Sequence, residues 1–153
     1  MPADIDAAWD FFSRPGNLKN ITPQNLGFHI LSKHHGEIMY PGQIIEYKVK
    51  PLLGIPLYWM TEITHVEEKK YFVDEQRFGP YAMWHHQHHF KVIDGGVEMT
   101  DIVHYKIPFW ILGDLANIIL VKSELTKIFE FRFAVVEQKF GGWKGHQNRV
   151  EFY

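Results

Sequence analysis

Apolar and polar residues alternate with a period of two through the middle of the chain, and with a helical period towards both ends. The two-residue period is typical of β-strands that bury one face. It predicts strands at 26–33, 43–50, 55–66, 70–77, 83–93 and 97–107. Asp-Gly-Gly at 94–96 is the clearest hairpin signal between them. We expect these strands to form one antiparallel sheet.

Helical spacing marks the two ends. Residues 5–13, IDAAWDFFS, predict a short helix that is capped by Asp4 or a neighbour, and NLKNI at 17–21 predicts a second short turn. No Gly or Pro occurs from Asp114 to Phe140, which predicts one long amphipathic helix ended by Gly141-Gly142. Its expected apolar stripe consists of Leu115, Ile118, Ile119, Leu125, Ile128, Phe129, Arg132, Phe133 and Val136.

This order of elements predicts an α+β domain over residues 1–141, followed by a tail at 142–153. An antiparallel sheet with one apolar face needs a cover, and the long C-terminal helix is the only predicted element large enough to provide it. A strongly curved sheet wrapped around one helix leaves an internal space, which is the expected place for a small ligand.

Composition narrows the functional classes. Hydrophobic residues make up 46% and aromatic residues 16% of the chain, which suits an apolar cavity. The formal charge of -2 and the lack of a long basic run argue against nucleic acid. There is no cysteine, so disulfides and thiolate chemistry are excluded. No apolar stretch reaches the ~18 residues of a membrane span and no signal peptide is visible, so we expect a cytoplasmic protein.

The segment WHHQHHFKVID at 84–94 places four histidines within five positions of one predicted strand. Alternation puts His85 and His89 on the outer face. The more apolar set is expected to face inwards: Trp84, His86, His88, Phe90 and Val92.

On the next strand the same alternation directs Asp101 and Tyr105 inwards. Unpaired buried polar groups cost about 1–3 kcal/mol each, so these inward groups should pair with one another, with water or with a ligand.

Several segments together resemble the START-like, birch-pollen-allergen-like superfamily, also called SRPBCC or helix-grip. They are PADIDAAWDFFSRPGNLKNITP, GPYAMWHHQHHF, MTDIVHYKIPF and IFEFR. The resemblance covers residues 2–141 and is strongest to a little-characterised bacterial branch, whose members are described as ligand-binding proteins, cell-division inhibitors or polyketide cyclase/dehydrase-like proteins. The branch patterns W-x-H-x-H-x-F and D-x-V-x-Y-x-x-P-F fall on residues 84–90 and 101–109.

The resemblance implies a helix-grip fold around a hydrophobic cavity that binds lipids, polyketides or aromatic metabolites. Such proteins normally begin with a strand before the first helix, and that strand is missing here. Either it is lost, or the true start lies upstream of Met1, or something else fills its place. We expect the tail segment NRVEFY or a second copy of the chain, in a homodimer, to cover the open sheet edge.

Four interpretations of the inward polar groups remain. Binding of a small, largely hydrophobic ligand is favoured, so a binding protein is preferred over an enzyme. The first alternative is a cyclase or dehydratase that uses His86 or His88 with Asp101 as acid and base. His86, His88 and Asp101 could instead ligate a metal, although we expect no metal or other cofactor. They could also form a purely structural network. A partner-interaction module without catalysis is a further alternative.

Arg132 lies within the apolar stripe of the long helix. A buried arginine needs a partner, for which an anionic ligand, Glu75 or Asp101 are options, whereas the favoured interpretation places its head group in water at the edge of the stripe. The residues predicted to line the cavity are Tyr47, Trp59, Trp84, His86, His88, Asp101, Tyr105, Phe129 and Arg132.

Overall fold

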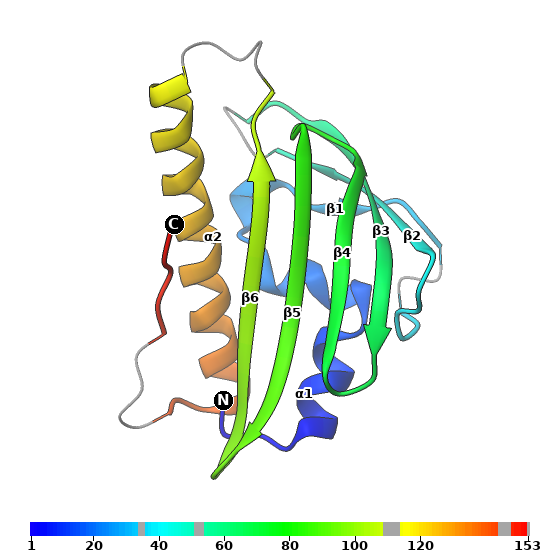
Figure 1. The fold of residues 1–153 in the computed structure, drawn as a ribbon, viewed down its shortest axis with the longest axis vertical. Helices are drawn as coiled ribbons and strands as arrows, with labels where there is room; N and C mark the ends of the chain where they lie inside the picture. Colours follow the sequence, from blue (N-terminus) through cyan, green and yellow to red (C-terminus); the bar gives the residue numbers. More distant parts are fainter. Residues whose placement is uncertain (34–35, 51–53, 109–113, 144–147, 153) are drawn as a thin grey trace.

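The computed structural model describes residues 1–33, 36–50, 54–108, 114–143 and 148–152, and the side chains of 114–118 lie outside this description. A six-stranded antiparallel sheet in the order β1-β2-β3-β4-β5-β6 is followed by a long helix (Figure 1). The elements are α1 (Ile5–Phe12), the 3-10 helices η1 (Pro15–Ile21) and η2 (Gln24–Leu26), the strands β1 (His29–Ile30), β2 (Gln43–Val49), β3 (Leu57–Glu67), β4 (Tyr71–Phe78), β5 (Met83–Ile93) and β6 (Gly96–Lys106), and α2 (Asp114–Phe140). The predicted helix-grip α+β fold is confirmed.

The first strand is much shorter than predicted. Leu26 ends a 3-10 helix, and Gly27 follows in the left-handed region with φ 54°, so no strand begins before His29. The backbone N–H groups of Leu31 and Ser32 both donate to the carbonyl of Glu46, which ends the regular ladder. The alternation of residues 26–33 therefore extends well beyond the two paired residues.

The short helix α1 and the long helix α2 cover the same face of the sheet. The Asp4 carboxylate accepts a hydrogen bond from the N–H of Ala7 at 2.7 Å and caps α1. The Trp9 ring packs edge-on against Phe90 of the inner sheet face, with centroids 5.4 Å apart. Phe11 packs against Phe140 of α2, with centroids 5.6 Å apart, and these contacts join the helices into one core.

Two inward predictions are wrong. Ile119 is 61% exposed, because it lies two residues before the buried Val121 and so on nearly the opposite side of the helix. Val92 is 65% exposed, although its register partner Val97 on β6 is fully buried.

The N-terminus takes up part of the open edge of β6. The amino group of Met1 donates to the carbonyl of Val97 at 2.8 Å, and the N–H of Val97 donates to the carbonyl of Met1 at 3.0 Å. Among the described residues no other strand pairs with this edge of β6. A homodimer that uses this edge stays a prediction.

The C-terminal tail lies elsewhere. The amide of Asn148 donates to the carboxylate of Glu137 at 2.9 Å, and the ammonium group of Lys122 lies 5.3 Å from the centre of the Phe152 ring. These contacts place the tail beside α2 (Figure 1), so the prediction that NRVEFY covers the sheet edge is wrong.

The join between the N-terminus and β6 is tested by adding one methyl group at Gly96. A Cβ there would lie 2.6 Å from the Trp143 ring and also meet the Met1 carbonyl. We expect Gly96→Ala to lower the free energy of unfolding by about 1–3 kcal/mol through overpacking. Gly142→Ala is the control, because nothing lies within 4 Å of its added Cβ. Urea unfolding measures both, and equal midpoints would contradict this packing.

Candidate functional site

A cavity of about 170 Å³ lies between the inner face of the sheet, α2 and the N-terminal helical segment. Its walls are mainly apolar and aromatic, because inward positions of β2 and β3 face the apolar stripe of α2 across it. The lining includes Ile45, Trp59, Ile63, Leu125, Ile128 and Phe129. Only a small set of polar side chains interrupts these walls.

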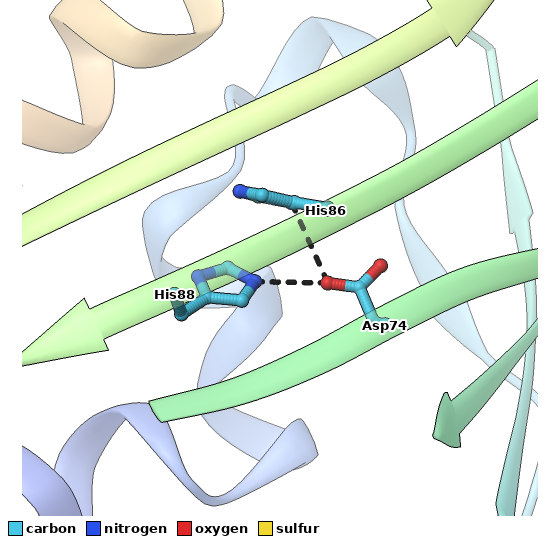
Figure 2. Close-up of side chains that lie close together, drawn as sticks. All are labelled: Asp74, His86 and His88. Atoms are coloured by element: carbon cyan, nitrogen blue, oxygen red, sulfur yellow. Dashed lines mark hydrogen bonds and ion pairs between the residues drawn. The ribbon is translucent and has the colours of Figure 1, made fainter. Parts of the chain in front are cut away.

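Five ionisable side chains from four elements meet at one wall of the cavity. Asp74 on β4 is the register partner of His86 on β5, and His88 is the partner of Asp101 on β6. Because alternate residues of a strand share a face, this register directs all four side chains inwards. Arg132 approaches the same group from α2. Figure 2 shows both imidazoles directed towards the Asp74 carboxylate.

Each imidazole contacts both carboxylates. Nε2 of His86 lies 2.9 Å from Oδ1 of Asp101, and its Nδ1 lies 3.4 Å from Oδ2 of Asp74. Nε2 of His88 lies 2.8 Å from Oδ2 of Asp74. Its Nδ1 lies 2.7 Å from Oδ1 of Asp101, although these two atoms are not aligned for a hydrogen bond. Nη1 of Arg132 donates to Oδ1 of Asp101 at 3.4 Å.

Burial and the neighbouring charges shift the pKa values of these groups in different directions. Burial and the charge of His88 lower the pKa of His86. Burial also acts to lower the pKa of His88, but the contacts of this imidazole with Asp101 and Asp74 outweigh burial and raise that pKa. Burial acts to raise the pKa of Asp101, yet Arg132 and His88 hold it well below its usual value. The pKa of Asp74 is lowered too, because the two histidines outweigh its burial.

These directions favour a charged His88 and a neutral His86. The carboxylates of Asp74 and Asp101 face the imidazoles, and Asp101 also faces the Arg132 guanidinium, so opposite charges are paired within the wall. The two imidazoles lie against each other, with ring centroids 3.8 Å apart.

Among the described residues, Asp74, His86 and His88 form the one group in which three ligand atoms lie close enough for a shared metal ion, within 4.8 Å of one another. Two imidazoles and one carboxylate suit zinc or iron. The same atoms are already engaged with each other and with Asp101, however, and Arg132 brings a positive charge to the group. A metal would have to displace these contacts, so the geometry fits an ion-pair network better than a metal centre.

Of the nine residues predicted to line the cavity, seven do so: Tyr47, Trp59, Trp84, His86, His88, Phe129 and Arg132. Asp101 contacts the histidines but is not among the described lining residues. Tyr105 is not among them either, and its ring lies beside two residues that do line the cavity, Trp84 and Tyr81, with centroids 6.4 Å and 6.0 Å away.

Arg132 and Asp74 differ from expectation. The favoured interpretation of Arg132, with its head group in water, is wrong: the residue is 8% exposed and pairs with Asp101. Glu75 is not its partner, because it contacts Arg77 and His85 on the outer face. Sequence reasoning missed Asp74, although Phe72, which precedes it by two residues, is an apolar inward position that signals the same face.

Comparisons with known proteins support the fold. No protein-family model matches the sequence, and none of the curated proteins matches it. Protein Ms6760 from Mycobacterium smegmatis is 16% identical with a TM-score of 0.64, over 91% of this chain and 85% of that one. Ara h 8.0201 is 17% identical with a TM-score of 0.55, over 90% and 93%.

A nucleoside-diphosphate sugar epimerase from Corynebacterium glutamicum is 19% identical with a TM-score of 0.61, over 90% of this chain but only 27% of that one. At these identities the likeness establishes the helix-grip fold alone and carries no function. Among the described helices, none has the length and apolar character needed to cross a bilayer.

The ionic cluster predicts a large cost for removing one of its carboxylates. Asp101→Asn keeps the shape of the side chain but leaves Arg132 and His88 without their shared counter-ion. We expect the free energy of unfolding to fall by about 3–5 kcal/mol. Asp10→Asn is the control, because Asp10 pairs with Arg14 at the surface, where such a pair adds little. Urea unfolding at neutral pH compares the two, and equal losses would contradict a buried ionic network.

The opposite pKa shifts predict how stability depends on pH. The stabilisation from His88 is complete below the pKa of an unfolded histidine, about 6.5, and is lost as the pH rises through its raised native pKa. The contributions of His86 and Asp101 are present above their unfolded pKa values and are lost as the pH falls through their lowered native ones. NMR titration of the imidazole Hε1 protons measures directly the order in which His86 and His88 titrate. If His86 titrates above His88, the assignment is wrong.

Proposed function

We propose that the protein binds a small, largely hydrophobic ligand in the internal cavity. The observation that carries this proposal is the combination of an apolar, aromatic lining with one polar wall inside a cavity of about 170 Å³. Ligand sites in proteins typically have this composition, in which apolar walls supply affinity and a few polar groups fix orientation.

The size of the cavity limits the ligand. Typical pockets for drug-sized molecules enclose roughly 300–1,000 Å³. An apolar cavity of about 150 Å³ in another protein stays dry and accepts benzene. The cavity here therefore suits a compound built on one ring, rather than a long acyl chain or a sterol.

The resemblance of the sequence to the bacterial ligand-binding branch of the START-like superfamily supports the same proposal. A cytoplasmic location is proposed on the composition of the chain alone. The partner-interaction alternative stays a prediction that no observation favours.

The cyclase or dehydratase alternative rests on one observation, namely that the pKa values of His86 and His88 are shifted in opposite directions. Pairs of titratable groups separated in this way are found where one acts as acid and the other as base. Burial and the contacts of both histidines with Asp74 and Asp101 also explain these shifts without chemistry. Ligand binding is therefore the function that we propose first.

Ligand binding is tested by filling the cavity. Leu125 is buried on α2 and lines the cavity, so Leu125→Phe places a ring inside it. We expect the wild-type protein to bind one-ring hydrocarbons such as toluene with a Kd of about 1 mM or tighter, and Leu125→Phe to lose at least roughly tenfold in affinity. Isothermal calorimetry and ¹H–¹⁵N NMR shifts measure the binding.

The matched control is Leu120→Phe, the same substitution on the same helix at a residue that is 53% exposed. This variant should bind as the wild type does. Circular dichroism melting first establishes that both variants are folded. A wild-type protein that binds no one-ring compound, or a Leu120→Phe variant that loses as much as Leu125→Phe, would contradict the proposal.

A further inference from the structure

One oxygen of the Asp74 carboxylate has no partner among the described residues. Oδ2 lies 2.8 Å from Nε2 of His88 and 3.4 Å from Nδ1 of His86. Oδ1 accepts no hydrogen bond from a described residue, and it is not among the unpaired polar atoms that the protein covers completely. Figure 2 shows this second oxygen directed away from both imidazoles. Asp74 therefore uses one oxygen within the protein and keeps the other accessible.

The accessible oxygen of Asp74 borders the cavity. The Asp74 side chain is 17% exposed, whereas the other four members of the ionic cluster are 6–12% exposed. Asp74 lies on the inner face of β4. Its register partner Ile63 on β3 lines the cavity with it, as does Phe72, two residues earlier on β4. Neither Ile63 nor Phe72 has a side-chain donor, so Oδ1 is left to water or to an occupant of the cavity.

The other unpaired polar atoms of this wall offer less to an occupant. Nε1 of Trp59, Nδ1 of His88 and Nε of Arg132 are covered completely by protein, so no ligand can reach them. Nδ1 of His86 faces Oδ2 of Asp74. Nη2 of Arg132 makes no hydrogen bond with a described residue and is not covered completely, so one donor also remains on this wall.

The accessible oxygen selects a group that donates a hydrogen bond. Burial acts to raise the pKa of Asp74, but the two imidazoles outweigh it and lower that pKa, and an ionised carboxylate only accepts hydrogen bonds. An ammonium group would bring three donors to walls that are mainly apolar, and its unpaired donors would be costly. A hydroxyl group brings one donor and keeps lone pairs that can accept, and its hydrogen bond replaces that of the water which it displaces.

We propose that the occupant is a one-ring compound with a hydroxyl group that donates a hydrogen bond to Oδ1 of Asp74. This inference rests on the proposed function, because it requires that the cavity holds a ligand. It adds the class of ligand, a cyclic or aromatic alcohol or a phenol, and the residue that orients it. The bond to a carboxylate is charge-assisted, so it is stronger than a bond between two neutral groups.

Three neutral probes of nearly equal size separate the possibilities. Benzyl alcohol carries the O–H, ethylbenzene replaces the hydroxyl by a methyl group, and anisole keeps an oxygen atom without its hydrogen. An apolar cavity without an acceptor would bind benzyl alcohol roughly tenfold more weakly than ethylbenzene, because a buried unpaired hydroxyl is costly. We expect the wild-type protein to bind benzyl alcohol at least as tightly as ethylbenzene, and more tightly than anisole. Calorimetry at neutral pH measures the three dissociation constants.

Two charged probes test whether the wall selects an ion instead. Benzylamine is protonated at neutral pH and replaces the hydroxyl by an ammonium group, and benzoate carries a carboxylate. We expect both to bind more weakly than benzyl alcohol. The ammonium group leaves donors unpaired, and benzoate has no hydrogen to donate to Asp74. The same calorimetric series measures both.

Two variants with the same change, from carboxylate to amide, test the role of Asp74. Asp74→Asn keeps the shape of the side chain and removes the charged acceptor, so the preference for benzyl alcohol over ethylbenzene should fall by roughly tenfold or more. Glu75→Gln is the control, because Glu75 is the next residue on β4 and contacts Arg77 and His85 on the outer face, so the preference should not change. Ethylbenzene makes no hydrogen bond, and its affinity in each variant corrects for changes in cavity shape.

A measurement on the wild-type protein covers the case in which Asp74→Asn does not fold. The side-chain carboxyl ¹³C resonance of Asp74 should shift clearly more with benzyl alcohol than with ethylbenzene, because only the alcohol bonds to the carboxylate. The same resonance of Asp10, which pairs with Arg14 at the surface, is the internal control and should not move.

Each outcome decides the proposal. If ethylbenzene, anisole, benzylamine or benzoate binds the wild type more tightly than benzyl alcohol, the hydroxyl assignment is overturned while ligand binding stands. A preference that persists in Asp74→Asn, or an equal carboxyl shift with benzyl alcohol and ethylbenzene, overturns the role of Asp74. Failure of every probe to bind the wild type overturns the proposed function together with this inference.

Discussion

The pairing of opposite charges in one buried wall is the constraint on which the rest of this structure depends. Two carboxylates, two imidazoles and one guanidinium meet among side chains that are mostly buried, and removal of any one charge leaves another uncompensated. The cluster joins β4, β5, β6 and α2, so it ties the central strands to the covering helix. Well-packed apolar side chains could hold these elements together equally well, so the proposed function gives a reason for five ionisable groups beside the cavity.

The polar wall and the apolar walls have complementary roles in the proposed ligand site. Aromatic side chains from β2, β3 and α2 provide apolar contact area for a ligand. Their packing against one another leaves these rings little freedom to rearrange. The members of the ionic cluster pair with each other, although Nδ1 of His88 and Nε of Arg132 have no hydrogen-bond partner among the described residues.

Structural likeness and sequence resemblance carry different weight here. The three solved structures described above share the helix-grip arrangement at 16–19% identity, which establishes the path of the chain and nothing about its ligand. One of them is a much longer protein in which this fold is about a quarter of the chain. The same arrangement therefore occurs alone and within larger proteins, and the argument for function has to come from the side chains that line the cavity.

The sequence by itself determined the elements whose pattern is local. The helix predicted at 114–140 is α2, because the absence of Gly and Pro and the recurrence of apolar residues are properties of the segment itself. Alternation likewise directed His86 and His88 inwards, because successive side chains of any strand point to opposite faces.

Only the tertiary structure decided which side chains from distant segments meet. Register places Asp74 opposite His86, and no local pattern contains that pairing. Arg132 lies in an apolar stripe of α2, and it can be buried there only because Asp101 lies within reach as a counter-ion. Tyr105 follows the predicted alternation yet lies beside Tyr81, away from the histidines, because position along the strand matters as much as face. Contacts of this kind depend on strand register and sheet curvature, which are set by the packing of the whole domain.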